Sequence, residues 1–349
     1  MTGLEAISVE VAPKLDAIDL EWDEYVYGRP SGSVFHLTAW QRALARTFSY
    51  AGSFCVARKN GKICGLLPLY SVRHLPAGQS LISIPFAVYG GICTDDVSAE
   101  KALLEHAQGM AEKLRVRYLE LRHEKATGDL PVKDLYVTFR REIYGDEEKN
   151  LNAIPRKQRR MVRQGDKHGL QAHVGGKELL EEFYAVYSSS VRNLGTPVFP
   201  RRWFEHLLGE FGSACRILGV FHEKIMVAGV MTFFFRDQVM PYYGGAYPWS
   251  FKYAANDFMY WKLLCYGAEH GYKVFDFGRS KEGTGPYDFK RHWGFEPTPL
   301  PYQYHLVTQK AIPNLNPTNP KLSLPIELWK RLPLPVSQWL GPKLIQFFP

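Results

Sequence analysis

The segment DFGRSKEGTGPYDFKRHWG, from Asp276 to Gly294, is the richest stretch of the sequence in side chains that could do chemistry. It begins in the alternating run VFDF, which predicts a strand. Open α/β sheets bind ligands where their strands end. Glycines free this backbone to turn its N–H groups toward an anion, and the neighbouring cations would hold that anion. We therefore predict a substrate site here; the alternative is a polar surface loop over a short helix.

The candidate substrate-binding residues come from this segment and from two Tyr-Gly-Gly motifs. They are Arg279, Ser280, Lys281, Gly283, Gly285, Tyr287, Trp293, Tyr243, Gly244, Gly245 and Tyr89. The two cations are expected to hold an anion or to form structural ion pairs. The tyrosines either line a cleft or pack, and Trp293 fits a core better than a ligand platform.

Common catalytic and metal-binding motifs are absent from the sequence. It contains no GxSxG, HExxH or Walker A pattern, and its 11 histidines show no metal-ligand spacing. We therefore expect neither a metal nor Ser-His-Asp chemistry. The 5 cysteines are far apart and form no CxxC pair, which indicates free thiols in a reducing cytoplasm.

Length and charge narrow the class of protein. A chain of 349 residues is expected to form two domains with separate cores. The net charge of +8 favours an anionic partner: a nucleotide, RNA, a phospholipid surface or an acidic sugar. No apolar run is long enough for a bilayer, and the N-terminal MTGLEAISVE does not resemble a signal peptide.

The two halves of the sequence predict the same order of elements. Each has two strands around a turn, a third strand near a Tyr-Gly-Gly motif, a helix and a fourth strand. The predicted ranges are 54–58, 63–70, 80–84, 99–114 and 118–122, then 216–221, 225–234, 239–242, 253–270 and 274–277. Tyr89 and Tyr243 recur at nearly the same offset as Arg122 and Arg279. This favours a duplicated α/β domain over two unrelated domains.

The repeat predicts four regions: a first lobe over 1–145, a linker helix over 146–170, a second lobe over 171–310 and a proline-rich tail over 311–349. The linker's cations share one helical face, formed by Arg156, Arg159, Arg160, Arg163 and Lys167. This face either meets phosphates or is a solvated surface pairing with the acidic run 146–148. Further helices are predicted over 177–193 and 201–211.

The tail combines many prolines with aromatic, aliphatic and basic residues. It is either a foot at the membrane interface or a strap over the lobes. The strap is favoured, because prolines interrupt any long amphipathic helix.

Several of these motifs resemble the FemAB-related proteins found with exosortase, PEP-CTERM and exopolysaccharide genes. The resemblance rests on FGRS, Gly-Thr-Gly, FK and WGFEP between Phe277 and Pro297, and on the second Tyr-Gly-Gly motif. The basic helix and the LPLP…LGP tail add to it. It covers most of the chain and implies two lobes of the GNAT acyltransferase fold in tandem, α/β (α+β) with mixed sheets.

The resemblance also implies an activity. Fem-type enzymes transfer an amino acid from aminoacyl-tRNA to an amine of a peptidoglycan precursor, and relatives use acyl-CoA. Their catalytically important Phe-Lys pair corresponds to Phe289 and Lys290. The sequence lacks a long inserted helical arm and a Q/R-x-x-G-x-G/A signature, of which only Arg163-Gln164-Gly165 is a fragment. The sequence therefore does not decide whether the acyl donor is aminoacyl-tRNA or acyl-CoA. No tightly bound cofactor is expected.

An acyl transfer assigns roles to these residues. Lys290, helped by loop N–H groups, would stabilise the oxyanion and the leaving group. Asp276, Asp288 and Glu282 are candidate bases, although Asp276 could equally be a strand-end carboxylate held by the fold. We expect a cytoplasmic N-acyltransferase acting on a cell-envelope or exopolysaccharide precursor, with its active site in the second lobe. The alternatives are an acyl-CoA-dependent N-acetyltransferase and a non-catalytic module binding an anionic glycan or lipid.

Overall fold

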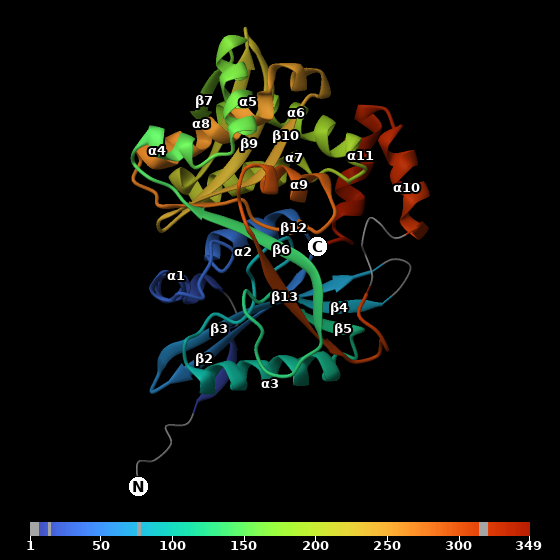
Figure 1. Cartoon of the computed structure of the whole chain (residues 1–349). Coiled ribbons are helices and arrows are strands. Elements are labelled where there is room, and N and C mark those ends of the chain that lie inside the picture. The colour runs from blue at the N-terminus through green and yellow to red at the C-terminus, as the bar shows by residue number, and fades with distance from the viewer. Residues whose placement is uncertain (1–6, 13–14, 75–77, 314–319) are drawn as a thin grey trace. The chain divides into compact units, whose positions relative to one another are not determined.

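The computed structural model describes residues 7–12, 15–74, 78–313 and 320–349 (Figure 1). The chain divides into two compact α/β units. Unit 1 comprises Met1–Tyr136, Pro299–Pro313 and Gln346–Pro349, and unit 2 comprises Val137–Thr298 and Asn314–Ile345. The units do not follow the expected boundaries at 145, 170 and 310, because two continuous strands carry the chain from one unit into the other.

The sheet of unit 1 has the order β1-β2-β3-β4-β5-β13. Its strands are β1 (Ser8–Ala12), β2 (Ala51–Lys59), β3 (Lys62–Arg73), β4 (Gln79–Ser83), β5 (Tyr118–Leu121) and β13 (Pro297–Leu306). Only β4 and β5 pair in parallel within this order. The helices are α1 (Asp19–Gly28), α2 (Thr38–Thr47) and α3 (Val97–Lys113). Helix α3 packs its small residues on the sheet, where Gly65 leaves room for Leu103.

The sheet of unit 2 has the order β7-β8-β9-β10-β11-β6. Its strands are β7 (Gln171–Gly175), β8 (Cys215–His222), β9 (Ile225–Phe235), β10 (Gln238–Ala246), β11 (Val274–Asp276) and β6 (Val132–Glu142), and the short β12 (Ser280–Lys281) pairs with β6. Here β10 and β11 are the parallel pair. The helices are α4 (Glu147–Asn152), α5 (Arg156–Lys167), α6 (Leu180–Asn193), α7 (Arg201–Phe211), α8 (Ala255–Glu269), α9 (Gly285–His292), α10 (Pro320–Lys330) and α11 (Leu334–Ile345).

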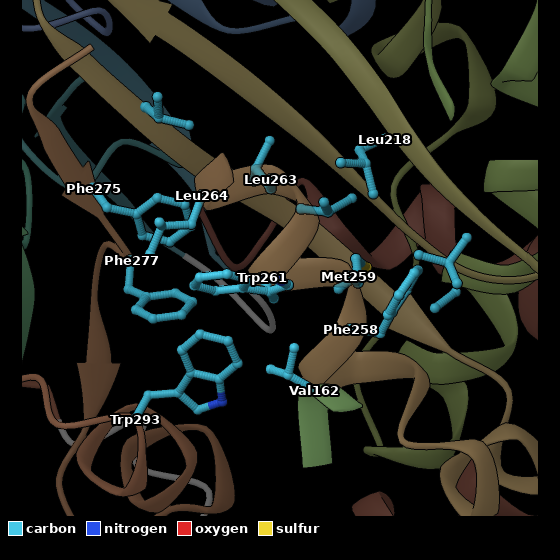
Figure 2. Close-up of a cluster of buried hydrophobic side chains, with 14 of the residues drawn as sticks. Val162, Leu218, Phe258, Met259, Trp261, Leu263, Leu264, Phe275, Phe277 and Trp293 are labelled. Atoms are coloured by element: carbon cyan, nitrogen blue, oxygen red, sulfur yellow. The ribbon is translucent and has the colours of Figure 1, made fainter. Parts of the chain in front are cut away.

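The core of unit 2 lies between α8 and the sheet. Figure 2 shows its side chains, among them Phe258, Trp261 and Leu264 from α8, Phe275 and Phe277 from the end of β11, and Trp293 after α9. Burial of such side chains supplies most of the driving force for folding. The loop after β11 is therefore anchored on both sides by buried aromatic residues.

The predicted duplication is confirmed in the order of the elements. Both units contain an antiparallel hairpin, a third strand, a helix and a fourth strand parallel to the third. The two Tyr-Gly-Gly motifs differ, however. The first lies in the loop after β4, whereas the second lies within β10, where Gly245 lets α6 approach. The same tripeptide therefore occurs at or after the third strand of each repeat, but with a different backbone conformation in each unit.

Part of the tail packs within unit 2, as the strap prediction required. Helices α10 and α11 contact α6. The Trp329 indole donates to the Thr196 carbonyl at 3.1 Å, Arg192 donates to the Leu332 carbonyl at 2.9 Å, and the Gln338 amide donates to Ser188 Oγ at 2.9 Å. Pro325 and Pro342 lie inside these short helices. None of the helices in the described ranges combines the length and apolar character needed to traverse a bilayer.

Candidate active site

The parallel strands β10 and β11 pair over only two positions, Gln238 with Val274 and Val239 with Phe275. Beyond them β10 continues to Ala246, with a register shift against β9 between Pro241 and Tyr243. Strand β11 ends at Asp276 and leads into the predicted substrate segment. That segment forms a loop, the two-residue β12, a turn and α9, so its predicted start at a strand end is confirmed.

Lys290 on α9 is turned into the protein rather than toward solvent, with 8% of its surface exposed. Its Nζ donates to the carbonyl oxygens of Phe277 at 2.7 Å, Gly278 at 3.0 Å and Arg279 at 3.1 Å. Three acceptors match the three hydrogens of a protonated amine. The ammonium group therefore fixes the backbone that follows β11.

The surroundings of Lys290 also change its acidity. Burial lowers its pKa from 10.5 to about 7; the Asp276 charge opposes this shift, and the Arg279 charge adds to it. The Phe139 ring centroid lies 5.4 Å from Nζ. An ammonium with a pKa near neutrality is a better proton donor than an ordinary lysine. As placed, however, donation to a substrate oxygen requires one of the three carbonyl bonds to break.

Asp276 is completely buried, and both of its carboxylate oxygens are occupied. Oδ2 accepts from Arg140 Nε at 2.7 Å, and Oδ1 accepts from the backbone N–H of Gly278 at 2.7 Å. The sequence allowed two roles for Asp276, a catalytic base or a strand-end carboxylate held by the fold. These contacts fit the second role, because neither oxygen is accessible to a substrate. Sequence reasoning missed Arg140, because β6 lies far from Asp276 in the chain.

The rest of the loop contains a buried hydroxyl group, that of Ser280. Ser280 is buried, and its Oγ has no hydrogen-bond partner among the described residues. Gly283 adopts a φ of 73°, which favours glycine, and Thr284 Oγ1 donates to the Lys281 carbonyl at 2.7 Å. Buried hydroxyls usually find partners, so Ser280 is a candidate substrate contact.

The candidate aromatic residues around α9 pack together. Phe289 lies 5.4 Å from Tyr260 between ring centroids, and Tyr287 lies 5.5 Å from Phe139. Trp293 is completely buried and donates to Asp257 Oδ1 at 3.0 Å, which agrees with its core alternative. Burial raises the pKa of Asp257 to about 6 against the opposing Trp293 hydrogen bond.

The second Tyr-Gly-Gly motif is split between the two faces of β10. Tyr243 is buried and accepts from Trp203 Nε1 at 3.0 Å, and Gly245 lies against Ser190 of α6. Gly244 faces α8, where an added Cβ would meet the Tyr260 hydroxyl at 3.0 Å. Because successive strand residues point to opposite faces, only Gly244 shares the face of α8. Sequence reasoning missed Tyr260, for which glycine spacing gave no signal.

The basic helix has the face that the sequence predicted. In α5, Gln158, Val162 and Gly165 are buried, and an added Cβ at Gly165 would meet the Phe258 ring of α8 at 2.5 Å. Arg156, Arg160, Arg163 and Lys167 are exposed. Within the described ranges, none of them forms an ion pair within 4 Å, whereas Asp166 pairs with Lys262 at 3.6 Å. The predicted pairing with the acidic run 146–148 is therefore not observed there.

Comparison with known proteins agrees with this architecture. Residues 151–291 match the family model described as Acetyltransferase (GNAT) domain. No curated protein matches the chain. Among solved structures, FemX has a TM-score of 0.66 at 15% identity, covering 83% of this chain and 96% of FemX.

Two further structures share the fold. The C-terminal domain of a putative lysylphosphatidylglycerol synthetase from Agrobacterium fabrum has a TM-score of 0.57 at 12% identity, covering 85% of this chain and 93% of that domain. A tandem GNAT protein from the clavulanic acid biosynthesis pathway has a TM-score of 0.51 at 13% identity, covering 88% of this chain and 100% of that one. The chain thus has the tandem GNAT-like fold, and its matched region includes Lys290 and the loop after β11.

Proposed function

We propose that the protein is an N-acyltransferase of Fem type, which transfers an aminoacyl or acyl group to an amine of a cell-envelope or exopolysaccharide precursor. The observation that carries the proposal is the buried Lys290 ammonium, which clamps three successive carbonyls where β11 ends. The same loop contains the Ser280 hydroxyl, for which the described part of the chain provides no hydrogen-bond partner. The match of residues 151–291 to a GNAT acetyltransferase domain and the FemX-like fold support the transferase class.

The proposed reaction forms a bond from the acceptor nitrogen to the donor carbonyl carbon. The bond from that carbon to the ester oxygen or thioester sulfur breaks, and the proton lost by the amine ends on the leaving group. Lys290 fixes the backbone of this loop, and loop N–H groups not bonded within the protein would stabilise the developing oxyanion. With a pKa near 7 it also delivers a proton to the leaving group, when the substrate replaces one of its carbonyl acceptors. Holding both reactants together supplies much of the acceleration.

The exposed cations of α5 support a donor that carries phosphates. Arg156, Arg160, Arg163 and Lys167 extend along one side of the helix, which suits the backbone of aminoacyl-tRNA. Acyl-CoA is the second candidate donor, favoured by the acetyltransferase family match. Isothermal titration with coenzyme A separates the two, because absence of heat at high ligand counts against the thioester donor.

The proposal is tested by an activity screen of the full chain. The protein is incubated with charged tRNAs or with acyl-CoAs, each with amine-bearing envelope precursors, and product masses are measured. We expect a product heavier by one aminoacyl or acyl group, lost in Lys290→Ala that remains folded. If biological activity persists in Lys290→Ala, the non-catalytic binding module is the better account.

We also propose peripheral membrane contact through the tail. Leu324, Leu328 and Trp339 are more than half exposed on α10 and α11, and Lys343 Nζ lies 3.5 Å from the Trp339 ring centroid. Aromatic, aliphatic and basic side chains together suit an anionic membrane interface. Co-sedimentation with phosphatidylglycerol vesicles is expected to fall in Leu328→Gln/Trp339→Gln. Unchanged binding would mean that these tail residues do not contact the membrane.

A further inference from the structure

Unit 1 contains a cavity of about 340 Å³ at the end of its own parallel strand pair. Strands β4 and β5 pair at Leu81 with Leu119 and at Ile82 with Glu120. The cavity is lined by residues that follow each strand, including Tyr89 and Gly91 after β4 and His123 after β5. Its volume is in the range of small-molecule sites.

Among the described residues, one ring nitrogen of the cavity-lining His123 has no hydrogen-bond partner. The side chain is buried, with 4% exposed, and Nδ1 lies 2.9 Å from Gln303 Oε1. The Gln303 amide is oriented by Thr127, because its Nε2 donates to the Thr127 carbonyl at 2.7 Å and its Oε1 accepts from the Thr127 N–H at 2.8 Å. The oxygen therefore faces His123, so Nδ1 carries the hydrogen.

The remaining nitrogen, Nε2, then carries a lone pair. It is buried and has no hydrogen-bond partner among the described residues. Burial lowers the pKa of His123 from 6.5 to about 4, although the Gln303 hydrogen bond opposes the shift, so the ring is neutral at pH 7. A neutral acceptor enclosed in a cavity wall requires a donor to satisfy it.

Gly91 is what allows the His123 ring to occupy this place. An added Cβ at Gly91 would lie 2.0 Å from His123 Cδ2 and 2.9 Å from its Cα. A second cavity histidine, His36, provides a contrast. Its Nε2 lies 2.8 Å from the Gly91 carbonyl oxygen, and its Nδ1 lies 2.8 Å from Ser33 Oγ. Both ring nitrogens of His36 are therefore engaged within the protein.

The charges of the lining favour donors over anions. Asp95, Glu100 and Glu124 line the cavity together with the cations Arg122 and Lys125. The Arg122 guanidinium is already engaged, because its Nε donates to Glu120 at 2.8 Å and its other nitrogens donate to the backbone oxygens of Ala87 at 3.1 Å and Pro349 at 2.8 Å. Asp95 pairs with Arg29 at 2.8 Å. Phosphate would therefore meet more carboxylates than available cations.

We propose that this cavity binds a small ligand bearing hydroxyl and amino groups and no phosphate, such as an amino sugar, with one of these groups donating to His123 Nε2. Glu100, which lines the same cavity, accepts another of the ligand's donors. This site is built within unit 1 and does not depend on the reaction proposed for unit 2.

The test observes the histidine side-chain nitrogens of the full chain by NMR at pH 7, with His123 assigned from the His123→Phe variant. Glucosamine is titrated in, and inorganic phosphate is titrated in separately. We expect a saturable shift of His123 Nε2 with glucosamine, no shift with phosphate, and an unmoved His36, which is the internal control. The wild-type spectrum also reports whether Nδ1 carries the hydrogen.

Three results would overturn the proposal. The first is a His123 resonance that does not respond to glucosamine. The second is an equal response to inorganic phosphate, which would indicate an anion site. The third is a wild-type ring that is protonated at Nε2 at pH 7. The titrations use the wild-type chain, and His123→Gln supplies the assignment if His123→Phe does not fold.

Discussion

The two units carry a parallel strand pair with the same two-position register, yet the ends of these pairs differ in what they offer a ligand. In unit 1, Arg122 follows β5 directly and donates to backbone carbonyls, and a cavity remains beside it. In unit 2, Lys290 reaches back from α9 to clamp the carbonyls after β11, among packed aromatic rings. A buried cation thus satisfies carbonyls at both ends, although the two cations come from different places in the repeat.

This difference adds a residue to the correspondence drawn from the sequence. The spacing paired Arg122 with Arg279, and the structure shows that Lys290 donates to the three carbonyls after β11. Arg279 contributes one of those carbonyls through its backbone. Each unit therefore holds a buried cation that donates to backbone carbonyls.

The largest expected effect comes from removing the clamp in unit 2. Lys290→Met keeps the length and apolar stem of the side chain but leaves three carbonyls without their donor. We expect loss of transferase activity by roughly 100-fold or more and a lower free energy of unfolding by about 1–3 kcal/mol. Steady-state kinetics and urea unfolding measure the two effects.

Arg291→Met is the matched control for Lys290→Met. Arg291 is the next residue on α9 and pairs with Glu296 at an exposed site, at 2.9 Å. Its loss is expected to change stability by less than about 1 kcal/mol. Equal activity of the Lys290→Met variant and the wild type would refute the role of the clamp.

The next effect concerns His123 in unit 1 and is a dependence of stability on pH. Its pKa lies near 4 in the folded chain and near 6.5 when unfolded, so the unfolded chain binds more protons between these values. Stability should therefore fall by about 3 kcal/mol as the pH drops from 6.5 to 4, at ~1.4 kcal/mol per pKa unit. Urea unfolding across this range should show a shallower fall in His123→Phe.

Gly91→Ala perturbs the same site by steric means. The added methyl group overlaps the His123 ring, and we expect a loss of about 1–3 kcal/mol together with a displaced His123 resonance. Gly109→Ala is the matched control, because nothing lies within 4 Å of its added Cβ on helix α3. That control is expected to gain about 0.5–1 kcal/mol. If the two variants changed stability and the His123 resonance to the same extent, Gly91 would not be what makes room for the His123 ring.

The smallest effect on stability is expected at α5, where the effect on binding is larger. Arg160→Gln/Arg163→Gln removes two exposed cations, and stability should change by less than about 0.5 kcal/mol per site. If α5 contacts RNA, tRNA binding weakens and the slope of log K against log salt falls by roughly 1–2. Filter binding across a salt series measures this, and Lys62→Gln/Lys113→Gln, which removes two exposed cations of unit 1, is the control for net charge. An unchanged slope would mean that α5 does not bind the phosphates of the tRNA donor.

Local patterns in the sequence predicted much of the fold, because hairpins and amphipathic helices depend on near neighbours. The turn at Lys59–Gly61, helix α3 and helix α7 all follow from such patterns. The contacts that define the two sites join distant residues instead. Arg140 reaches Asp276, and Gln303 orients His123, across stretches of chain that carry no periodic signal. Segment 276–294 was identifiable by composition, whereas the inward turn of Lys290 depends on tertiary packing.

Strands β6 and β13 carry the chain between the units. This connectivity determines when each unit can complete its fold during synthesis. Unit 1 needs residues 299–313, which include most of β13 and hold Gln303, and unit 2 needs helices α10 and α11. A ribosome releasing this chain in order therefore exposes an unfinished sheet edge at β5 until β13 has been synthesised. A fragment ending at Tyr136 would carry that open edge permanently, so such a fragment is expected to aggregate rather than to report on the first lobe.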